Sequence, residues 1–183
     1  MKIVAIVGSL RAGSSSRSAL CKAAEGARSA GATVELLDLR DLDLPLCDGR
    51  SDVSTYGPDV QRMHALVLGA DALLVGSPEY HGSMTGALKN ALDLLGEAPV
   101  RGKLVGLLAV ARGDAGAMNT LNHLRHVFRW MGAWVLPTQV SVPRAKEAFA
   151  ADGQPLRDGL ADELAALGTE TVRYAGLLAG GQA

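Results

Sequence analysis

The sequence predicts an α/β protein with three layers, in which a five-stranded parallel sheet lies between two layers of helices. Short apolar runs, several rich in β-branched residues, alternate with longer helix-like segments along the 183 residues. Such runs are typical of strands buried on both faces, and their alternation with helices favours right-handed βαβ units. The strands fit the order 2-1-3-4-5, in which the loops after strands 1, 3 and 4 open into one crevice at the carboxyl edge.

The first strand is expected at residues 2–7, Lys-Ile-Val-Ala-Ile-Val, and leads directly into a loop at 8–17. A helix is expected at 18–30, because alanine and leucine recur there at helical spacing and Gly31 stands at the C-cap position. A strand, a Gly/Ser loop and a helix in this order direct backbone N–H groups and a helix dipole toward an anion.

The side chains of the 8–17 loop narrow the choice of anion. Its hydroxyl and guanidinium donors are Ser9, Ser14, Ser15, Ser16, Arg11 and Arg17. The loop lacks the lysine of a triphosphate loop, because Ser14 stands at that position, and it lacks the G-x-G-x-x-G turn of a dinucleotide site. One terminal phosphate is therefore the expected ligand, and a solvated Ser/Gly linker is the alternative.

The remaining elements follow the same alternation. Further strands are expected at 33–39, 71–76, 103–110 and 134–143, and further helices at 58–69, 87–95 and 118–131. Residues 40–56 are expected to be irregular because Pro45 interrupts them, and residues 144–153 to be a polar excursion. A last amphipathic helix is expected with one apolar stripe, formed by Leu156, Leu160, Leu164 and Leu167.

Composition limits the kinds of partner. The 18 Lys and Arg residues and 19 Asp and Glu residues leave a net charge of −1, which provides no basic field for nucleic acid and no polybasic patch for a membrane. Cys21 and Cys47 form no C-x-x-C motif, and no Cys/His cluster has metal-ligand spacing. No signal peptide or apolar span is visible. We expect a single domain over residues 1–183, cytoplasmic, with reduced thiols, no metal and a small-molecule partner.

Three stretches resemble a known family. Gly-Ser-Leu-Arg at 8–11 with Gly-Ser at 13–14, Pro-Glu-Tyr-His-Gly-Ser at 78–83 and Gly-Ala-Leu-Lys-Asn-Ala-Leu-Asp at 86–93 are similar to the NADPH-dependent FMN reductase family of flavodoxin-like proteins, which includes flavin, quinone, azo-dye and chromate reductases. The resemblance covers roughly residues 2–143. It implies a flavodoxin-like fold, non-covalent FMN, and hydride transfer from NADPH or NADH to the flavin and then to a small acceptor.

The resemblance and the loop chemistry together give an expected cofactor site. Its residues are Ser9, Arg11, Ser14, Ser15, Ser16, Pro78, Glu79, Tyr80, His81, Gly82, Ser83, Arg112 and Gly113. No catalytic side chain is expected, because the flavin N5 does the covalent work. The family commonly has Asn where this chain has Ser16 and His81. The serine keeps a hydroxyl for phosphate, whereas the imidazole changes a contact near the ring and with it, we expect, the preference for acceptors.

Several roles stay open from sequence alone. Tyr80 either lines the ring or only packs, His81 either bonds a ligand oxygen or faces solvent, and Glu79 is expected to shape its loop or meet a neighbouring subunit rather than act as a base. Arg125 and Arg129 either attract the 2′-phosphate of NADPH or form a solvated helix face. The other histidines, His64, His123 and His126, are expected to be surface or packing residues.

Function and assembly follow as expectations. The favoured function is an NAD(P)H-dependent reductase. An electron-carrier flavodoxin is the alternative, and a flavodoxin-like module without turnover is a third hypothesis. The segment 118–134 carries more large apolar residues than one core-facing stripe buries, namely Leu121, Leu124, Val127, Phe128, Trp130, Met131 and Trp134. A homodimer, which the resemblance also implies and extends to a homotetramer, is therefore expected.

Overall fold

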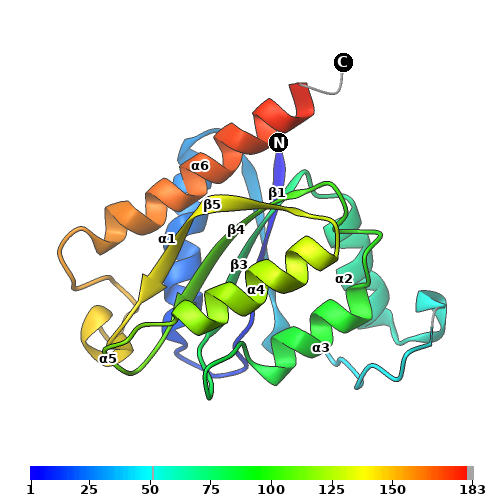
Figure 1. Cartoon of the computed structure of the whole chain (residues 1–183), viewed down its shortest axis with the longest axis horizontal. Coiled ribbons are helices and arrows are strands. Elements are labelled where there is room, and N and C mark those ends of the chain that lie inside the picture. The colour runs from blue at the N-terminus through cyan, green and yellow to red at the C-terminus, as the bar shows by residue number, and fades with distance from the viewer. Residues whose placement is uncertain (51, 181–183) are drawn as a thin grey trace.

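The structure is a computed structural model that describes residues 1–50 and 52–180. Its centre is a parallel sheet of five strands in the order β2-β1-β3-β4-β5 (Figure 1). The strands are β1 (Lys2–Val7), β2 (Thr33–Asp38), β3 (Ala72–Pro78), β4 (Leu104–Val110) and β5 (Trp134–Val142). The predicted sheet and its strand order are therefore confirmed, with strand ends that differ from the expected ones by a residue or two.

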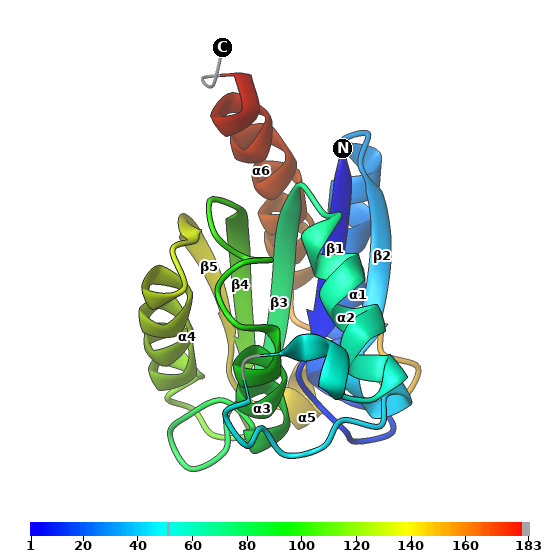
Figure 2. The same cartoon turned by 90° about the vertical axis from the view of Figure 1, so that its right-hand side faces the viewer.

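Helices cover both faces of the sheet, so that the fold has three layers (Figure 2). On one face lie α1 (Ser15–Ser29) and α6 (Leu160–Gly180), and on the other lie α2 (Pro58–Leu68), α3 (Gly86–Leu95) and α4 (Met118–Trp130). A short helix, α5 (Ala145–Ala148), follows β5. Met1 and the end of α6 lie at the opposite end of the molecule from the carboxyl ends of the strands (Figure 1). That carboxyl edge, where the site is expected, is therefore bounded by loops.

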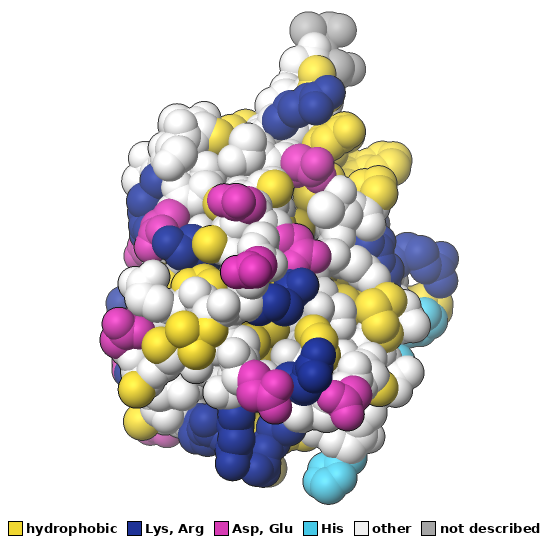
Figure 3. All heavy atoms as spheres, turned by 90° about the vertical axis from the view of Figure 1, so that its left-hand side faces the viewer, with side chains coloured by type: hydrophobic (Ala, Val, Ile, Leu, Met, Phe, Trp, Pro, Cys, Tyr) yellow, Lys and Arg dark blue, Asp and Glu magenta, His cyan; other side chains and the backbone are white. Residues whose placement is uncertain are grey.

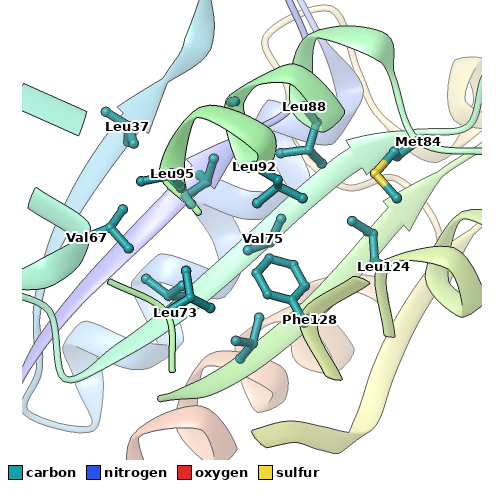
Figure 4. Close-up of a cluster of buried hydrophobic side chains, with 14 of the residues drawn as sticks. Leu37, Val67, Leu73, Val75, Met84, Leu88, Leu92, Leu95, Leu124 and Phe128 are labelled. Carbon is teal, nitrogen blue, oxygen red and sulfur yellow. The ribbon is translucent and has the colours of Figure 1, made fainter. Parts of the chain in front are cut away.

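Each face of the sheet has its own apolar core. On the face toward α2, α3 and α4, leucines of α3 meet Val75 of β3 and Phe128 of α4, which is fully buried (Figure 4). On the face toward α1 and α6, the sheet packs against a row of small alanines on α1, among them Ala19, Ala23 and Ala27. Small residues let α1 approach the sheet closely.

Two glycines set how closely α1 and α6 pack. A Cβ on Gly26 of α1 would overlap the carbonyl oxygen of Ala165, and one on Gly168 of α6 would overlap the carbonyl oxygen of Ala23. The two backbones therefore touch directly. Because α1 also begins at the 8–17 loop, this contact helps to fix where that loop stands relative to the sheet.

Four local expectations need correction. Helix α1 begins at Ser15 and not at 18, because Ser14 caps it. The 40–56 segment carries two turns of 3-10 helix, η1 (Leu39–Asp41) and η2 (Val53–Thr55), and a buried Tyr56. Residue 51 of this segment and residues 181–183 of the expected domain lie outside the described residues.

The remaining corrections concern the segment after β5. The expected polar excursion at 144–153 contains helix α5 and a buried Phe149. Leu156 is exposed and precedes α6, so it is not part of the helix stripe, whereas Leu160, Leu164 and Leu167 are buried as expected. The spacing of Leu156 fits a helix, but the chain from 150 to 159 is occupied by a turn and a bridge between Phe149 and Pro155.

Replacing Gly168 with alanine tests the contact between α1 and α6. We expect Gly168→Ala to lower the free energy of unfolding by about 1–3 kcal/mol or more, because the new methyl group meets rigid backbone. Gly176→Ala on the same helix is the matched control, since its Cβ meets only Met1 at 3.8 Å, and it should stabilise by up to about 1 kcal/mol. Urea denaturation measures both. Equal effects of the two changes would contradict the close approach.

Candidate functional site

One cavity of about 540 Å³ opens at the carboxyl edge of the sheet. It is bounded by the loops that follow β1, β3, β4 and β5, as the strand order requires. The lining residues are Ser9, Arg11, Ser14, Ser15, Ser16, Pro78, Glu79, Tyr80, His81, Gly82, Val110, Ala111, Arg112, Gly113, Ala115, Gly116, Ala145 and Lys146. All of the expected site residues except Ser83 are therefore brought together.

The first wall is the start of α1. Ser14 stands at the N-cap, where its Oγ accepts the N–H of Arg17 at 3.4 Å and lies 2.8 Å from the Oγ of Ser16. Ser9 is also buried and accepts the N–H of Arg11 at 3.3 Å. The first N–H groups of a helix have no partner within the helix, and they point out of its N-terminus. Hydroxyls, free N–H groups and one guanidinium thus line one end of the cavity.

Arg17 does not belong to this wall. Its Nε donates to Oδ2 of Asp38 at 3.0 Å, and the carboxylate of Asp38 is almost fully buried at the end of β2. The expectation that Arg17 binds the anion is therefore wrong, because its side chain extends to Asp38 at the end of β2 and does not line the cavity. Arg11 remains as the arginine of this loop that faces the cavity.

Thr85 joins the first loop to the second. Its Oγ1 donates to the carbonyl oxygen of Gly8 at 2.5 Å and accepts the N–H of Leu88 at 3.1 Å, so that one hydroxyl both anchors the first loop and caps α3. Gly8 donates its own N–H to the carbonyl of Gly76 at 2.8 Å, and a Cβ at Gly8 would lie 2.9 Å from that oxygen. Position 8 therefore requires glycine. Sequence reasoning did not identify the role of Thr85, because its partner is far away along the chain.

The second wall is a tight hairpin at residues 80–83. Tyr80 and Ser83 exchange backbone hydrogen bonds of 2.8 and 3.1 Å, and the two residues between them have positive φ angles, +52° at His81 and +77° at Gly82. Two successive positive φ angles define a type I′ turn, which Asn-Gly suits best. His81 therefore keeps the backbone shape that Asn favours while it places an imidazole at the exposed tip.

The hairpin is tied to helix α4 at two points. Oε2 of Glu79 accepts the N–H of Thr120 at 3.0 Å, which caps a helix whose own N-cap residue, Ala117, provides no side-chain bond. The Oγ of Ser83 lies 2.9 Å from Nδ1 of His123. Glu79 thus shapes the loop, as one of its expected roles required. Ser83 faces α4 and not the cavity, which corrects its expected place in the cofactor site.

The third wall is the loop after β4. A Cβ on Gly116, whose φ is +72°, would lie 2.6 Å from the Oγ of Ser141, and that same Oγ accepts the N–H of Ala117 at 2.8 Å. The backbone of this loop is therefore pressed against β5. Arg112 and Gly113 lie on the cavity side of it.

Some lining residues were not expected from sequence, above all Ala145 and Lys146 of α5. The strand order could have indicated them, because β5 lies beside β4 and its exit loop must share the same edge.

Arg125 departs from its expected options: its guanidinium donates to Gln139 and to the carbonyls of Leu136 and Pro137, and partial burial lowers its pKa. It ties α4 to β5.

The donor set fits a phosphate with a flat ring attached. Buried hydroxyls and a helix N-terminus are suited to phosphate oxygens, and Gly82, Gly113 and Gly116 offer backbone without a Cβ that a ring can approach closely. Among residues 1–50 and 52–180, no group of three or more His, Cys, Asp or Glu side chains is placed to hold a metal ion. No helix in the same residues combines the length and the apolar character needed to cross a bilayer. Fold and cavity together define a flavodoxin-like protein with a mononucleotide-type site.

Comparison with known proteins identifies the family. The family model described as NADPH-dependent FMN reductase matches residues 1–147, and the chain belongs to this family. An "NAD(P)H-dependent FMN reductase" of Pseudomonas aeruginosa is 35% identical over 164 residues, which cover 86% of each chain. An "NADPH azoreductase" of a Bacillus species is 37% identical over 125 residues, 68% of this chain and 65% of that protein. Among solved structures, an apo "NADH:FMN oxidoreductase (EMOB)" has a TM-score of 0.77 at 25% identity, covering 94% of this chain and 89% of that one.

The bond between Thr85 and Gly8 can be tested by removing the hydroxyl. We expect Thr85→Val to cost about 2–4 kcal/mol of unfolding free energy, because it removes a helix cap and leaves the buried carbonyl of Gly8 without a donor. Thr85→Ser keeps the hydroxyl and is the control, expected to lose less than half as much. Thermal and urea denaturation measure both. A valine variant as stable as the serine variant would show that the bond does not hold the loop.

Proposed function

We propose that this protein uses NADPH or NADH to reduce bound FMN and passes the electrons to a small oxidant such as free flavin, a quinone or an azo compound. The observation that carries the proposal is the convergence of the hydroxyl-rich start of α1 with the 80–83 hairpin and the loop after β4 in one cavity. Membership in the FMN reductase family and the reductase names of the relatives support it.

The residues of the cavity divide the binding between two ends. Ser9, Ser14 and Ser16, with Arg11 and the first N–H groups of α1, would hold the phosphate of FMN. Charge-assisted hydrogen bonds contribute about 1.5–3 kcal/mol each, so four give roughly 6–12 kcal/mol, which the cost of association, about 4–15 kcal/mol, largely consumes. The ring must therefore be held as well, by backbone of the hairpin and of the third loop.

When bound, FMN supplies a ring that accepts a hydride and gives electrons to an acceptor. The protein provides position and exposure. Tyr80 is half exposed and His81 stands at the exposed tip of the hairpin, so both would border the open side of the ring where nicotinamide and acceptor must arrive. We assign His81 to the selection of acceptors.

A visible spectrum tests this function. Protein supplemented with FMN and freed of excess should show a flavin band that bleaches on anaerobic addition of NADPH or NADH and returns when a quinone or an azo dye is added. A band that bleaches only with a chemical reductant would favour an electron carrier instead. Absence of any retained flavin would overturn the assignment of the cavity.

The double change Ser9→Ala with Arg11→Ala is the matched variant for the same experiment. Titration of flavin fluorescence should show at least tenfold weaker binding of FMN, corresponding to the loss of about 1.4 kcal/mol or more, with an unchanged unfolding midpoint. Riboflavin, which lacks the phosphate, is the control ligand and should bind wild type and variant equally. Equal loss for both ligands would place the change in the ring site or in the fold.

The assembly is also part of the proposal, as a homodimer that can pair further into a homotetramer. Leu121, Leu124 and Phe128 are buried in the core, whereas Trp130 is 73% and Trp134 60% exposed. Trp130 borders an apolar groove of about 450 Å³ between α3 and α4, whose rim carries Lys89, Asp93, Glu97 and His126. A rim with both signs of charge suits a second copy related by a twofold axis.

A cytoplasmic location, where NAD(P)H is available and Cys21 and Cys47 stay reduced, completes the proposal.

Introducing a charge at the groove tests the dimer. We expect Trp130→Lys to halve the mass seen by sedimentation velocity, because a lysine cannot be buried in an apolar interface without a partner. Leu177→Lys is the control, because Leu177 is 62% exposed but lies on α6, on the other face of the sheet from the groove. A wild-type protein that sediments as a monomer at micromolar concentration would overturn this part of the proposal.

A further inference from the structure

Two cations line the cavity on the side opposite to β1. Arg112 follows β4, and Lys146 follows β5 on helix α5. In the surface view, Lys and Arg side chains gather at the end of the molecule where the strands have their carboxyl ends, at the lower edge of Figure 3. The sequence stretches that indicated a phosphate site include neither residue, and the start of α1 does not account for them.

The backbone that carries the two cations is held in place. Ala111 donates its N–H to the carbonyl of Val142 at 2.8 Å, and Ala145 donates to the carbonyl of Ala111 at 2.9 Å. Arg144 donates to the carbonyl of Gly113 at 3.2 Å and has a positive φ of +46°, which turns the chain into α5. These bonds extend the β4–β5 pairing beyond the sheet. Arg112 and Lys146 are therefore fixed side by side at the level of the main chain.

Within the part of the chain that the structure describes, neither cation has a counter-charge beside it. Arg144 contacts Asp114 at 3.5 Å and Glu147 at 3.9 Å, and so it is partly neutralised. No carboxylate within residues 1–50 and 52–180 lies within ion-pair distance of Arg112 or Lys146. Two unpaired cations on the wall of a concave site raise the local concentration of anions.

The charges of the whole cavity show an excess of positive groups. Its cations are Arg11, Arg112 and Lys146, and its one acidic lining residue is Glu79, whose Oε2 accepts the N–H of Thr120. A terminal phosphate carries about two negative charges at neutral pH. Arg11, the hydroxyls and the dipole of α1 are suited to that one group, which leaves the other two cations available for a second anion.

We propose that Arg112 and Lys146 form a second anion-binding position that receives a phosphate group of the pyridine nucleotide. The inference rests on the proposed function, because it assumes that a nucleotide enters the same cavity. In the sheet order, β3 separates β1 from β4, and β5 lies beyond β4. With neighbouring strands about 4.8 Å apart, the loops after β4 and β5 leave the sheet about 10–14 Å from the end of β1. This separation is too large for both loops to contact one phosphate group through their backbones. It suits two phosphate groups on two different ligands.

Calorimetric titration of the FMN-loaded protein with NADP⁺ and NAD⁺ tests the position without turnover. The variants are Arg112→Gln, Lys146→Gln and the double change. Lys22→Gln is the matched control, because it removes the same charge from a residue outside the cavity. Lys22 lies on α1 and is paired with Glu25. We expect each single variant to weaken NADP⁺ binding about five- to tenfold and the double variant more. Lys146→Gln, which lies outside the expected FMN site, should leave binding of FMN within twofold of wild type.

Each outcome decides the proposal. Weakening of both nucleotides places the pyrophosphate at the pair, and weakening of NADP⁺ alone places the 2′-phosphate there, so either supports it. If FMN binding weakens and nucleotide binding does not, the pair belongs to the phosphate of FMN and the inference is wrong. It is also wrong if the double variant matches Lys22→Gln for both nucleotides. If the wild-type protein binds no nucleotide and NADPH does not bleach its flavin, the proposed function fails and the second position fails with it.

Discussion

The hydrogen bond from the Thr85 hydroxyl to the carbonyl of Gly8 is the interaction on which the candidate site depends. A parallel sheet covered by helices on both faces leaves its carboxyl edge as the place where loops from distant parts of the chain meet. Meeting at an edge does not by itself fix one loop against another. The Thr85 hydroxyl does so, since it caps α3 and anchors the turn that leads into α1 at the same time. The two ends of the expected FMN site are thereby held to one frame.

Glycine allows two elements to approach closely at three places in this fold. At Gly8 it allows the first loop to touch β3, at Gly116 it lets the third loop press against β5, and at Gly168 it lets α6 meet α1 backbone to backbone. In all three places a neighbouring atom occupies the space that a side chain would need. These glycines therefore determine how closely two elements can pack. They do not act by making the chain flexible.

Much of the fold could be predicted from sequence because apolar runs and small-residue loops are local signals. The same holds for the cavity residues contributed by the first two loops, since their motifs are contiguous. Arg17 was misplaced because its direction depends on where α1 begins, which Ser14 decides by capping. Lys146 was missed because its approach to Arg112 results from the pairing of β4 with β5. Leu156 had the spacing of a helix, but its segment forms a turn and the bridge between Phe149 and Pro155. Long-range pairing decided the case of Lys146, whereas a helix cap and a short turn decided the other two.

Helix α4 contacts the hairpin of the candidate site at one end and borders the apolar groove at the other. Its first turns hold the hairpin through Glu79 and Ser83, and its last turn carries Trp130, which borders the groove between α3 and α4. A rigid helix transmits a displacement from one end to the other. If a second subunit is seated on the groove, the free energy of association and the free energy of ligand binding are linked through this helix, and each must change the other by the same amount. The affinity for flavin then becomes a function of protein concentration.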